Sequence, residues 1–374
     1  SVSKTEGRGF ESLSPCQRGI TANSSDMGRV LAESYEEIRA HTGLRGLAAV
    51  AVVAYHVALA VPGDGYWIEQ HIFSRSFIFV DLFFLLSGFV LAYRYSGLFS
   101  GDAPFIGAAR HFAARRISRI YPNYLIWMTI ALIVWLALAL RNQQATPAAG
   151  DLAWSFLMHV AMVQSLLDAP VLWNTPLWSI AVEMIAYAIF PLMIVARTRL
   201  RLFDGGIAIV AVAIWLWLLQ GGGTIDVIAG APSVLRCLAG FSIGVLIAAH
   251  RDSIASRSPA SLSAVQILSV VAITGGLKFD LELATLAGFV ALTASTATNS
   301  SVLVDLLSFR GFAMLGAASY TIYLSHVPVL NLYLGGAGAL QNVLGLPFLS
   351  DWLIAVAMVG GATITISLMF YRLV

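Results

Sequence analysis

The sequence predicts an all-α membrane protein, a polytopic bundle of about ten transmembrane helices with both chain ends in the cytoplasm. Of its 374 residues, 58% are hydrophobic and only 11% are charged, whereas about a quarter of an ordinary soluble domain is charged. The apolar residues form long runs, and the arginines cluster in particular connections between them. The net charge of +2 is too small to indicate nucleic acid as a partner. Membrane lipid is therefore the expected solvent of most of the surface.

The N-terminal segment differs from the rest of the chain. Residues 1–43 are polar and contain no apolar stretch of the kind found in a signal peptide. Residues 1–26 are rich in Ser, Gly and Arg without periodicity, so we expect them to be disordered, and Met27 is an alternative start. The remainder, residues 44–374, is expected to form one membrane domain.

Ten apolar runs have the length of about 17 to 25 residues that a membrane-spanning helix needs. They cover residues 44–61, 77–93, 121–140, 178–196, 204–220, 233–249, 261–276, 281–299, 312–334 and 351–371. An eleventh run, 152–167, is short and contains Trp154, His159 and Gln164. Hydropathy alone does not decide whether it crosses the membrane.

The distribution of arginines decides the topology, because cytoplasmic loops carry the excess of positive charge. If 152–167 is an interfacial or re-entrant helix and the N-terminus is inside, only Arg75, Arg141 and Lys278 fall in outside loops. The cytoplasmic connections then hold Arg94, Arg110, Arg115, Arg116, Arg119, Arg197, Arg199, Arg201, Arg251, Arg257 and Arg310. Counting 152–167 as a span reverses this bias in the second half of the chain, so we expect ten spans.

Ionisable residues at membrane depth are candidates for a functional site, because charge in hydrocarbon is expensive. At a rise of about 1.5 Å per residue, His56 and Glu183 are expected roughly 7 to 8 Å below the outer surface, Asp81 at a similar level, and His326 roughly 12 Å down. The candidates at the inner face are Arg45, Arg94, Arg116 and Arg119. Two layers result, arginines inside and His with carboxylates outside.

This two-layer pattern favours a group-transfer enzyme. The planar fork of arginine pairs with phosphate, so an anionic donor would dock from the cytoplasm. A histidine beside a carboxylate, here His56 with Glu183 or Asp81, can act as general base on a group nearer the outside.

Simpler interpretations exist for several of these residues. Topology signals that bind anionic lipid headgroups are an alternative role for Arg94, Arg115, Arg116 and Arg119, and Arg45 can be present for the same reason. His159 and His326 can be hydrogen-bond donors between packed helices. Asp81 can cap a helix or reach the interface. Cys16 and Cys237 have no spacing suited to zinc, so no metal is expected.

Five separated motifs resemble the acyltransferase-3 family of bacterial membrane O-acyltransferases, over about Thr42 to Val374. They are LRGLAAVAVVAYH, with Arg45 and His56; FVDLFFLLSGFVL, with Asp81; ARRISRIYP, with Arg116 and Arg119; LWSIAVEMIAY, with Glu183; and SYTIYLSH, ending at His326. Relatives tend to continue with a Glu-x-Pro-like stretch after the last span, whereas this chain stops at FYRLV, so we expect a truncation there.

The resemblance implies transfer of an acyl group, usually acetyl, from cytoplasmic coenzyme A to a hydroxyl of an extracytoplasmic or lipid-linked sugar at the bacterial plasma membrane. It implies that Arg45 with His56, and Arg116 with Arg119, are essential. Acyl-CoA is then a co-substrate, and no tightly bound cofactor is expected. Our working mechanism gives donor binding to Arg45, Arg116 and Arg119, base catalysis to His56 with Glu183 or Asp81, and acceptor or oxyanion positioning to Tyr320, Tyr323 and His326.

Three alternatives remain open at this point. His56 can act as the base or carry the acyl group covalently. A proton-coupled transporter of saccharides or lipid intermediates would also need intramembrane His and Glu. A membrane sensor or scaffold is a third class, although it gives these buried groups no purpose.

Overall fold

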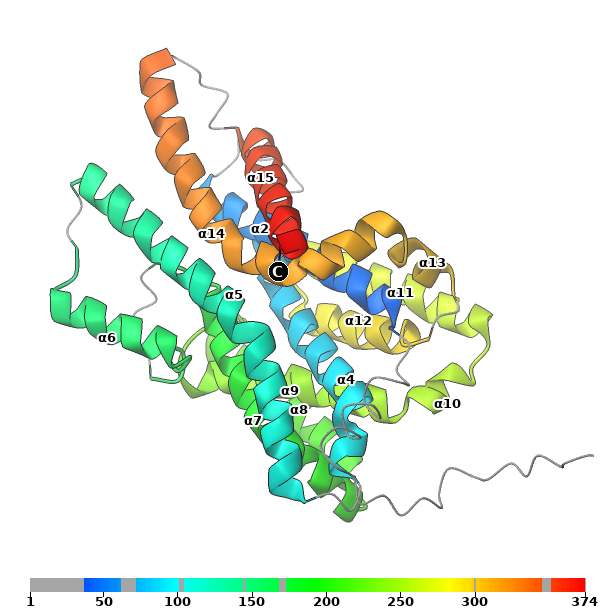
Figure 1. The fold of residues 1–374 in the computed structure, drawn as a ribbon. Helices are drawn as coiled ribbons and strands as arrows, with labels where there is room; N and C mark the ends of the chain where they lie inside the picture. Colours follow the sequence, from blue (N-terminus) through cyan, green and yellow to red (C-terminus); the bar gives the residue numbers. More distant parts are fainter. Residues whose placement is uncertain are drawn as a thin grey trace, which may run out of the picture. The chain divides into compact units, whose positions relative to one another are not determined.

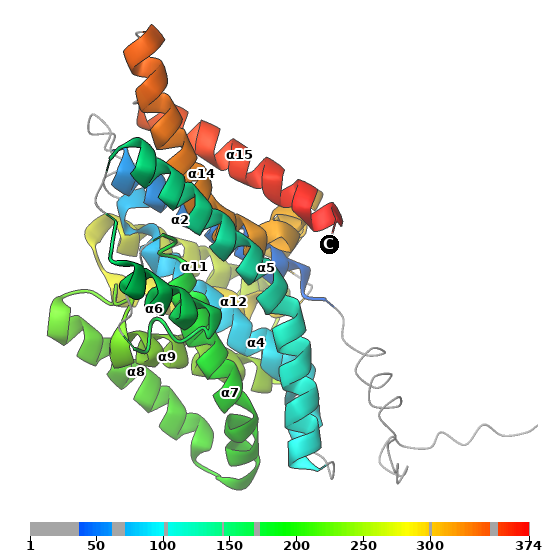
Figure 2. The ribbon, with the colours of Figure 1, turned by 60° about the vertical axis from the view of Figure 1, so that its left-hand side comes forward.

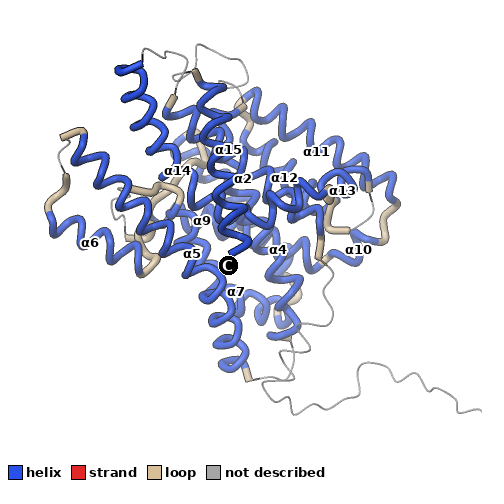
Figure 3. The backbone as a smooth tube through the Cα atoms, turned by 45° about the horizontal axis from the view of Figure 1, so that its top comes forward, coloured by secondary structure: helices blue, strands red, loops and turns tan. Residues whose placement is uncertain are grey.

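The structure is a computed structural model that describes residues 37–61, 72–100, 104–143, 146–167, 173–298, 301–344 and 351–373. The chain divides into two units, Ser1–Glu37 and Ile38–Val374, and everything below concerns the second unit. Every regular element among the described residues is a helix (Figure 3). The predicted all-α fold class is confirmed. The expectation for residues 1–26 lies outside the described residues.

The first half of the unit contains α2 (Arg39–Ala60), η1 (Phe73–Ile78), α4 (Phe79–Phe99), α5 (Phe105–Arg141), α6 (Ala149–Val160) and α7 (Leu177–Arg199). The second half contains α8 (Phe203–Gly222), α9 (Gly230–Ala249), α10 (Arg251–Ala255), α11 (Pro259–Phe279), α12 (Glu282–Ser295), α13 (Val302–Leu307), α14 (Arg310–Leu344) and α15 (Trp352–Leu373).

Each of the ten predicted spans is helical, but the lengths differ from the expectation. Within the described part, eight helices are long and apolar enough to cross a membrane, namely α2, η1 with α4, α5, α7, α8, α9, α11 and α15. Of the other two predicted spans, α12 has only 14 residues and α14 has 35. At about 1.5 Å per residue, α12 is shorter than the hydrocarbon core of a typical bilayer.

Helices α2 and α4 lie at the centre of the unit (Figures 1 and 2). Helix α2 packs against α14 and α15, and α4 packs against α9 and α12. The peripheral helices α8 and α15 expose large apolar side chains, for example Ile209 at 71% and Met369 at 62%. A helix that is apolar on its exposed face is suited to lipid contact, so the unit is a polytopic membrane bundle.

Glycines allow α4 and α9 to approach closely. A Cβ atom at Gly88 would collide with the carbonyl group of Phe241, and one at Gly244 with the backbone at Leu85. Gly240 also faces α4, where a Cβ would lie 3.3 Å from the Phe84 side chain. This contact holds the first halves of both helices together.

The directions of neighbouring helices confirm the treatment of residues 152–167. In α4 and α7, Phe84 meets Trp178 near the start of both helices, and Phe99 meets Phe190 further along both. The two helices therefore run in the same direction, so α5 is the single crossing between them. The absolute orientation, with both ends in the cytoplasm, stays a prediction.

Helix α6 has only 12 residues, and the chain turns back directly after it. Met162 has a positive φ of 56°, and Gln164 then donates from Nε2 to the carbonyl oxygen of Leu177 at 3.0 Å. The hydroxyl of Tyr124 on α5 donates to the carbonyl oxygen of His159. Burial lowers the pKa of His159, whose Nδ1 donates to the Ser155 carbonyl at 2.8 Å. The segment is thus a short helix with a buried return, and His159 has a packing role.

Candidate functional site

Four arginines from three helices lie close together, and we call them the inner arginines: Arg45 on α2, Arg94 on α4, and Arg116 and Arg119 on α5. Arg119 lies within electrostatic range of the other three. Among the described residues, none of the four forms an ion pair with a carboxylate. The cluster therefore combines four like charges, which is unfavourable unless an anion lies among them.

Arg116 shows this imbalance most clearly. Its side chain is buried, its Nη2 donates to the hydroxyl of Tyr95 at 2.6 Å, and its guanidinium lies over the Tyr95 ring. Its Nε has no hydrogen-bond partner in the described part of the chain. A buried guanidinium without a counter-ion is costly, so this position is suited to binding an anionic group.

A cavity of about 40 Å³ lies beside the inner arginines, between α2, α4, α7 and α14. Its lining includes Arg45, Glu183, Tyr320 and Tyr323, four of the predicted site residues. Tyr320 donates its hydroxyl to the Ile120 carbonyl at 3.0 Å, and the Tyr323 hydroxyl lies 2.8 Å from Ser179 Oγ. The volume is enough for a few water molecules. The structure thus brings the donor-side candidate Arg45 and the acceptor-side candidates Tyr320 and Tyr323 to one cavity.

His56, near the end of α2, and His326, midway along α14, form a pair. The Nδ1 atom of His56 lies 3.2 Å from Nε2 of His326, and the ring centroids are 4.7 Å apart. The same Nδ1 lies 3.0 Å from the carbonyl oxygen of Val52. Because a carbonyl can only accept, we assign the proton to Nδ1, which leaves the lone pair on Nε2 of His56.

The parallel arrangement of α2 and α14 sets this pair. Near the start of both helices, Gly46 and Gly316 allow close backbone contact, and ten residues further along each helix lie His56 and His326. The ring of Tyr323 lies 5.8 Å from that of His326. The histidine pair therefore adjoins the wall of the cavity.

The two carboxylates do not hydrogen-bond His56 in the way that we expected. Glu183 accepts from the hydroxyl of Ser87 and, at 2.7 Å, from that of Tyr187. Asp81 is fully engaged by Arg236. Glu183 is level with Ser87, six residues along α4 from Asp81, which corresponds to roughly 9 Å. The prediction that Asp81 and Glu183 lie at equal depth is therefore wrong. It counted residues from the ends of the two predicted spans, and α4 and α7 pack in a different register.

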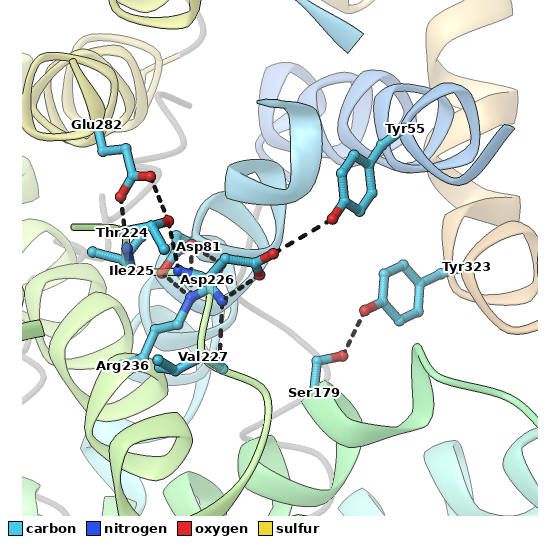
Figure 4. A network of polar contacts seen from close by, with 10 residues as sticks. All are labelled: Tyr55, Asp81, Ser179, Thr224, Ile225, Asp226, Val227, Arg236, Glu282 and Tyr323. Carbon is cyan, nitrogen blue, oxygen red and sulfur yellow. Dashed lines mark hydrogen bonds and ion pairs between the residues drawn. The ribbon is translucent and has the colours of Figure 1, made fainter. Parts of the chain in front are cut away.

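A second polar group, which we call the outer network, consists of Asp81, Arg236, Asp226 and Tyr55 (Figure 4). Arg236 donates to Asp81 from Nε and, at 2.8 Å, from Nη2, and both side chains are buried. Its Nη1 lies 3.2 Å from Asp226, whose other oxygen accepts from the hydroxyl of Tyr55 at 3.4 Å.

Sequence reasoning missed Arg236 and Asp226. Arg236 is the fourth residue of the predicted span 233–249, and an arginine inside an apolar run was the available signal. Asp226 lies in the short connection before α9 and carries no such signal. The simpler interpretation of Asp81 as a cap does not fit its ion pair.

The fold and these polar groups together define a polytopic helical membrane protein with a polar site inside the bundle. The chain belongs to the acyltransferase-3 family, because the family's sequence model, described as "Acyltransferase domain", matches residues 39–372. The predicted family and the enzyme class, acyltransferase, are confirmed. In the described residues, no group of three or more His, Cys, Asp and Glu side chains is arranged to hold a metal ion.

Three similar proteins illustrate the range of the family. The chain is 27% identical to a putative peptidoglycan O-acetyltransferase, YrhL, of Bacillus subtilis over 78% of this chain and 48% of that protein. It is 26% identical to the peptidoglycan O-acetyltransferase OatA of Listeria monocytogenes, over 82% of this chain and 51% of the relative. The acyltransferase MdmB of Streptomyces mycarofaciens is 34% identical over 40% of this chain and 38% of its own length.

The chain therefore spans about half or less of the length of these three relatives. No solved structure matches it.

Proposed function

We propose that the protein transfers an acetyl or other acyl group from cytoplasmic acyl-CoA to a hydroxyl of an extracytoplasmic or lipid-linked saccharide at the bacterial plasma membrane. The observation that carries this proposal is the buried guanidinium of Arg116, which has no carboxylate partner among the described residues and belongs to the same arginine cluster as the cavity-lining Arg45. The names of two relatives, which describe peptidoglycan O-acetyltransferases, support the choice of acyl group and acceptor.

The donor side is the group of inner arginines. Arg45, Arg116 and Arg119 bind the phosphates of acyl-CoA, because guanidinium groups pair with phosphate through two parallel hydrogen bonds. Arg45 and His56 are eleven residues apart on one helix, roughly 16 Å. The pantetheine arm has to bridge this distance past Glu183, Tyr320 and Tyr323, and these side chains must move apart to admit it, because the cavity they line holds only a few water molecules.

The reaction takes place at the histidine pair. Nε2 of His56 accepts the proton of the acceptor hydroxyl while the oxygen of that hydroxyl forms a bond to the thioester carbonyl carbon. The carbon–sulfur bond then breaks, and the leaving thiolate takes the proton from the imidazolium, giving an ester and coenzyme A. Tyr323 and His326 position the acceptor or the oxyanion. In the covalent variant, the same Nε2 attacks the thioester first and the acceptor then attacks the acyl-imidazole.

The test uses membranes that contain the full chain. They are incubated with labelled acetyl-CoA, and hydroxylamine-labile label is measured in the saccharide fraction. His56→Ala should reduce transfer at least about 100-fold, the lower end of the contribution of a positioned base, while the protein stays in the membrane. His250→Ala is the matched control, because His250 is exposed and pairs with Asp204 at a different place. Full activity of His56→Ala, or proton-coupled flux that needs no acetyl-CoA, would reject the proposal.

A further inference from the structure

A base inside a membrane bundle needs a nearby negative charge. When His56 takes a proton it becomes a cation, and a cation away from water is stabilised chiefly by an anion within a few ångströms. Glu183 is engaged by Ser87 and Tyr187, and Asp81 is engaged by Arg236. Neither of these carboxylates hydrogen-bonds the imidazole in the described part of the chain.

Asp226 is a third carboxylate near His56. It lies on the connection between α8 and α9, and its side chain is 29% exposed. It is within electrostatic range of the His56 ring. Tyr55, which hydrogen-bonds Asp226, meets the His56 ring edge-on at a centroid distance of 5.0 Å. Asp226 is therefore separated from the imidazole by one side chain.

The outer network contains more negative than positive charge. Arg236 carries one positive charge and contacts two carboxylates, so Asp81, Arg236 and Asp226 together carry one net negative charge. Asp81 holds two nitrogens of the guanidinium, whereas Asp226 contacts one. The uncompensated charge consequently lies mainly on Asp226, on the side that faces Tyr55 (Figure 4).

The connection that carries Asp226 is fixed in place. Glu282 on α12 accepts from the hydroxyl of Thr224 at 2.6 Å and from the backbone N–H of Ile225 at 2.7 Å. The Thr224 hydroxyl in turn accepts from the N–H of Asp226 at 3.1 Å. The carboxylate is thus held at a set place before any substrate binds, which is what electrostatic stabilisation of a transition state requires.

We infer that Asp226 is a positioning residue for acyl transfer, which stabilises the protonated form of His56 through its charge and orients Tyr55 beside the ring. The inference rests on the proposed function. Asp226 takes no proton itself: the proton moves from the acceptor hydroxyl to His56 and then to the leaving thiolate.

The test compares Asp226→Asn with Asp226→Glu in membranes, with labelled acetyl-CoA varied and hydroxylamine-labile label measured per folded protein molecule. Asp226→Asn keeps the size of the side chain and removes the charge. We expect its kcat to fall about 10- to 100-fold, the effect of one charge several ångströms away in a protein site, with KM for acetyl-CoA within about twofold of wild type. Asp226→Glu should recover most of the lost kcat.

Asp280→Asn is the matched control, because Asp280 is another carboxylate paired with an arginine, Arg75, on an exposed part of the chain. It should leave kcat unchanged. An unchanged kcat in Asp226→Asn, or no recovery in Asp226→Glu, would overturn the role. If the wild type and Asp280→Asn transfer no label either, the proposed function fails rather than this inference.

Discussion

The inner arginines and Arg236 differ in whether a carboxylate compensates their charge. Arg236 is completely buried and contacts two carboxylates. Arg116 is nearly as buried, at 6% exposure, and lies beside other arginines without any carboxylate partner in the described residues. A buried cation that has its counter-ion has a structural role, whereas a buried cation without a counter-ion is suited to binding an anionic ligand.

The largest effect should come from breaking the outer network. Arg236→Met leaves Asp81 buried with no counter-ion, and removing one partner of a buried pair costs about 3–5 kcal/mol. We expect a marked loss of folded protein and of thermal stability, measured by unfolding of the detergent-solubilised protein.

The double variant Arg236→Met with Asp81→Leu separates charge from packing. Replacing both partners with apolar residues removes the uncompensated charge, so much of the lost stability should return. If the single variant is as stable as wild type, Arg236 has no structural role of the kind assigned to it.

Arg116→Gln should have the opposite pattern. The removal of a buried guanidinium without a counter-ion should leave the free energy of unfolding unchanged or raise it. Charge-assisted hydrogen bonds to the donor phosphates would be lost, at about 1.5–3 kcal/mol, so KM for acetyl-CoA should rise about 10- to 100-fold. Steady-state transfer and thermal unfolding of one preparation measure both quantities.

Arg116→Lys refines this test, because lysine keeps the charge but lacks the planar fork. An intermediate KM is expected. A strongly destabilised Arg116→Gln with normal KM would place Arg116 with Arg236 as a structural residue.

The sequence was sufficient to predict the features that depend on loop charges and span lengths, namely the order of the membrane crossings and the end of the bundle at which the arginines lie. Counting arginines in connections placed Arg116 and Arg119 at one end of the bundle, the start of the span 44–61 placed Arg45 there, and the structure brings the three together. The same count led to the exclusion of 152–167 as a span, which the shared direction of α4 and α7 supports.

The sequence was insufficient wherever the answer depends on the register between helices. The contact of Glu183 with Ser87 depends on the packing register of α4 against α7, and the ends of the predicted spans do not specify this register. Arg236 was missed although it lies inside an apolar run, and its two carboxylate partners become apparent only from the packing of α9 against α4. Asp226 gains its importance only from the partners that α2, α9 and α12 bring to it.

Arg197 is a partly exposed arginine with a carboxylate partner, and its substitution should have the smallest effect on stability. It forms a two-point pair with Asp204, at 2.9 and 3.0 Å, and both side chains are about one-third exposed. Exposed pairs contribute at most about 1 kcal/mol and are screened by salt. Arg197→Gln should therefore shift thermal stability only slightly, and less at high ionic strength.

This variant also decides why the inner arginines matter. Arg197 is predicted on the same cytoplasmic side, so it shares any general attraction to anionic lipid headgroups. If the cationic surface alone drew acetyl-CoA to the membrane, Arg197→Gln and Arg116→Gln would raise KM equally. Because Arg197 already has a carboxylate and Arg116 has none, we expect KM to change in Arg116→Gln alone, and equal changes would reduce the inner arginines to a topology signal.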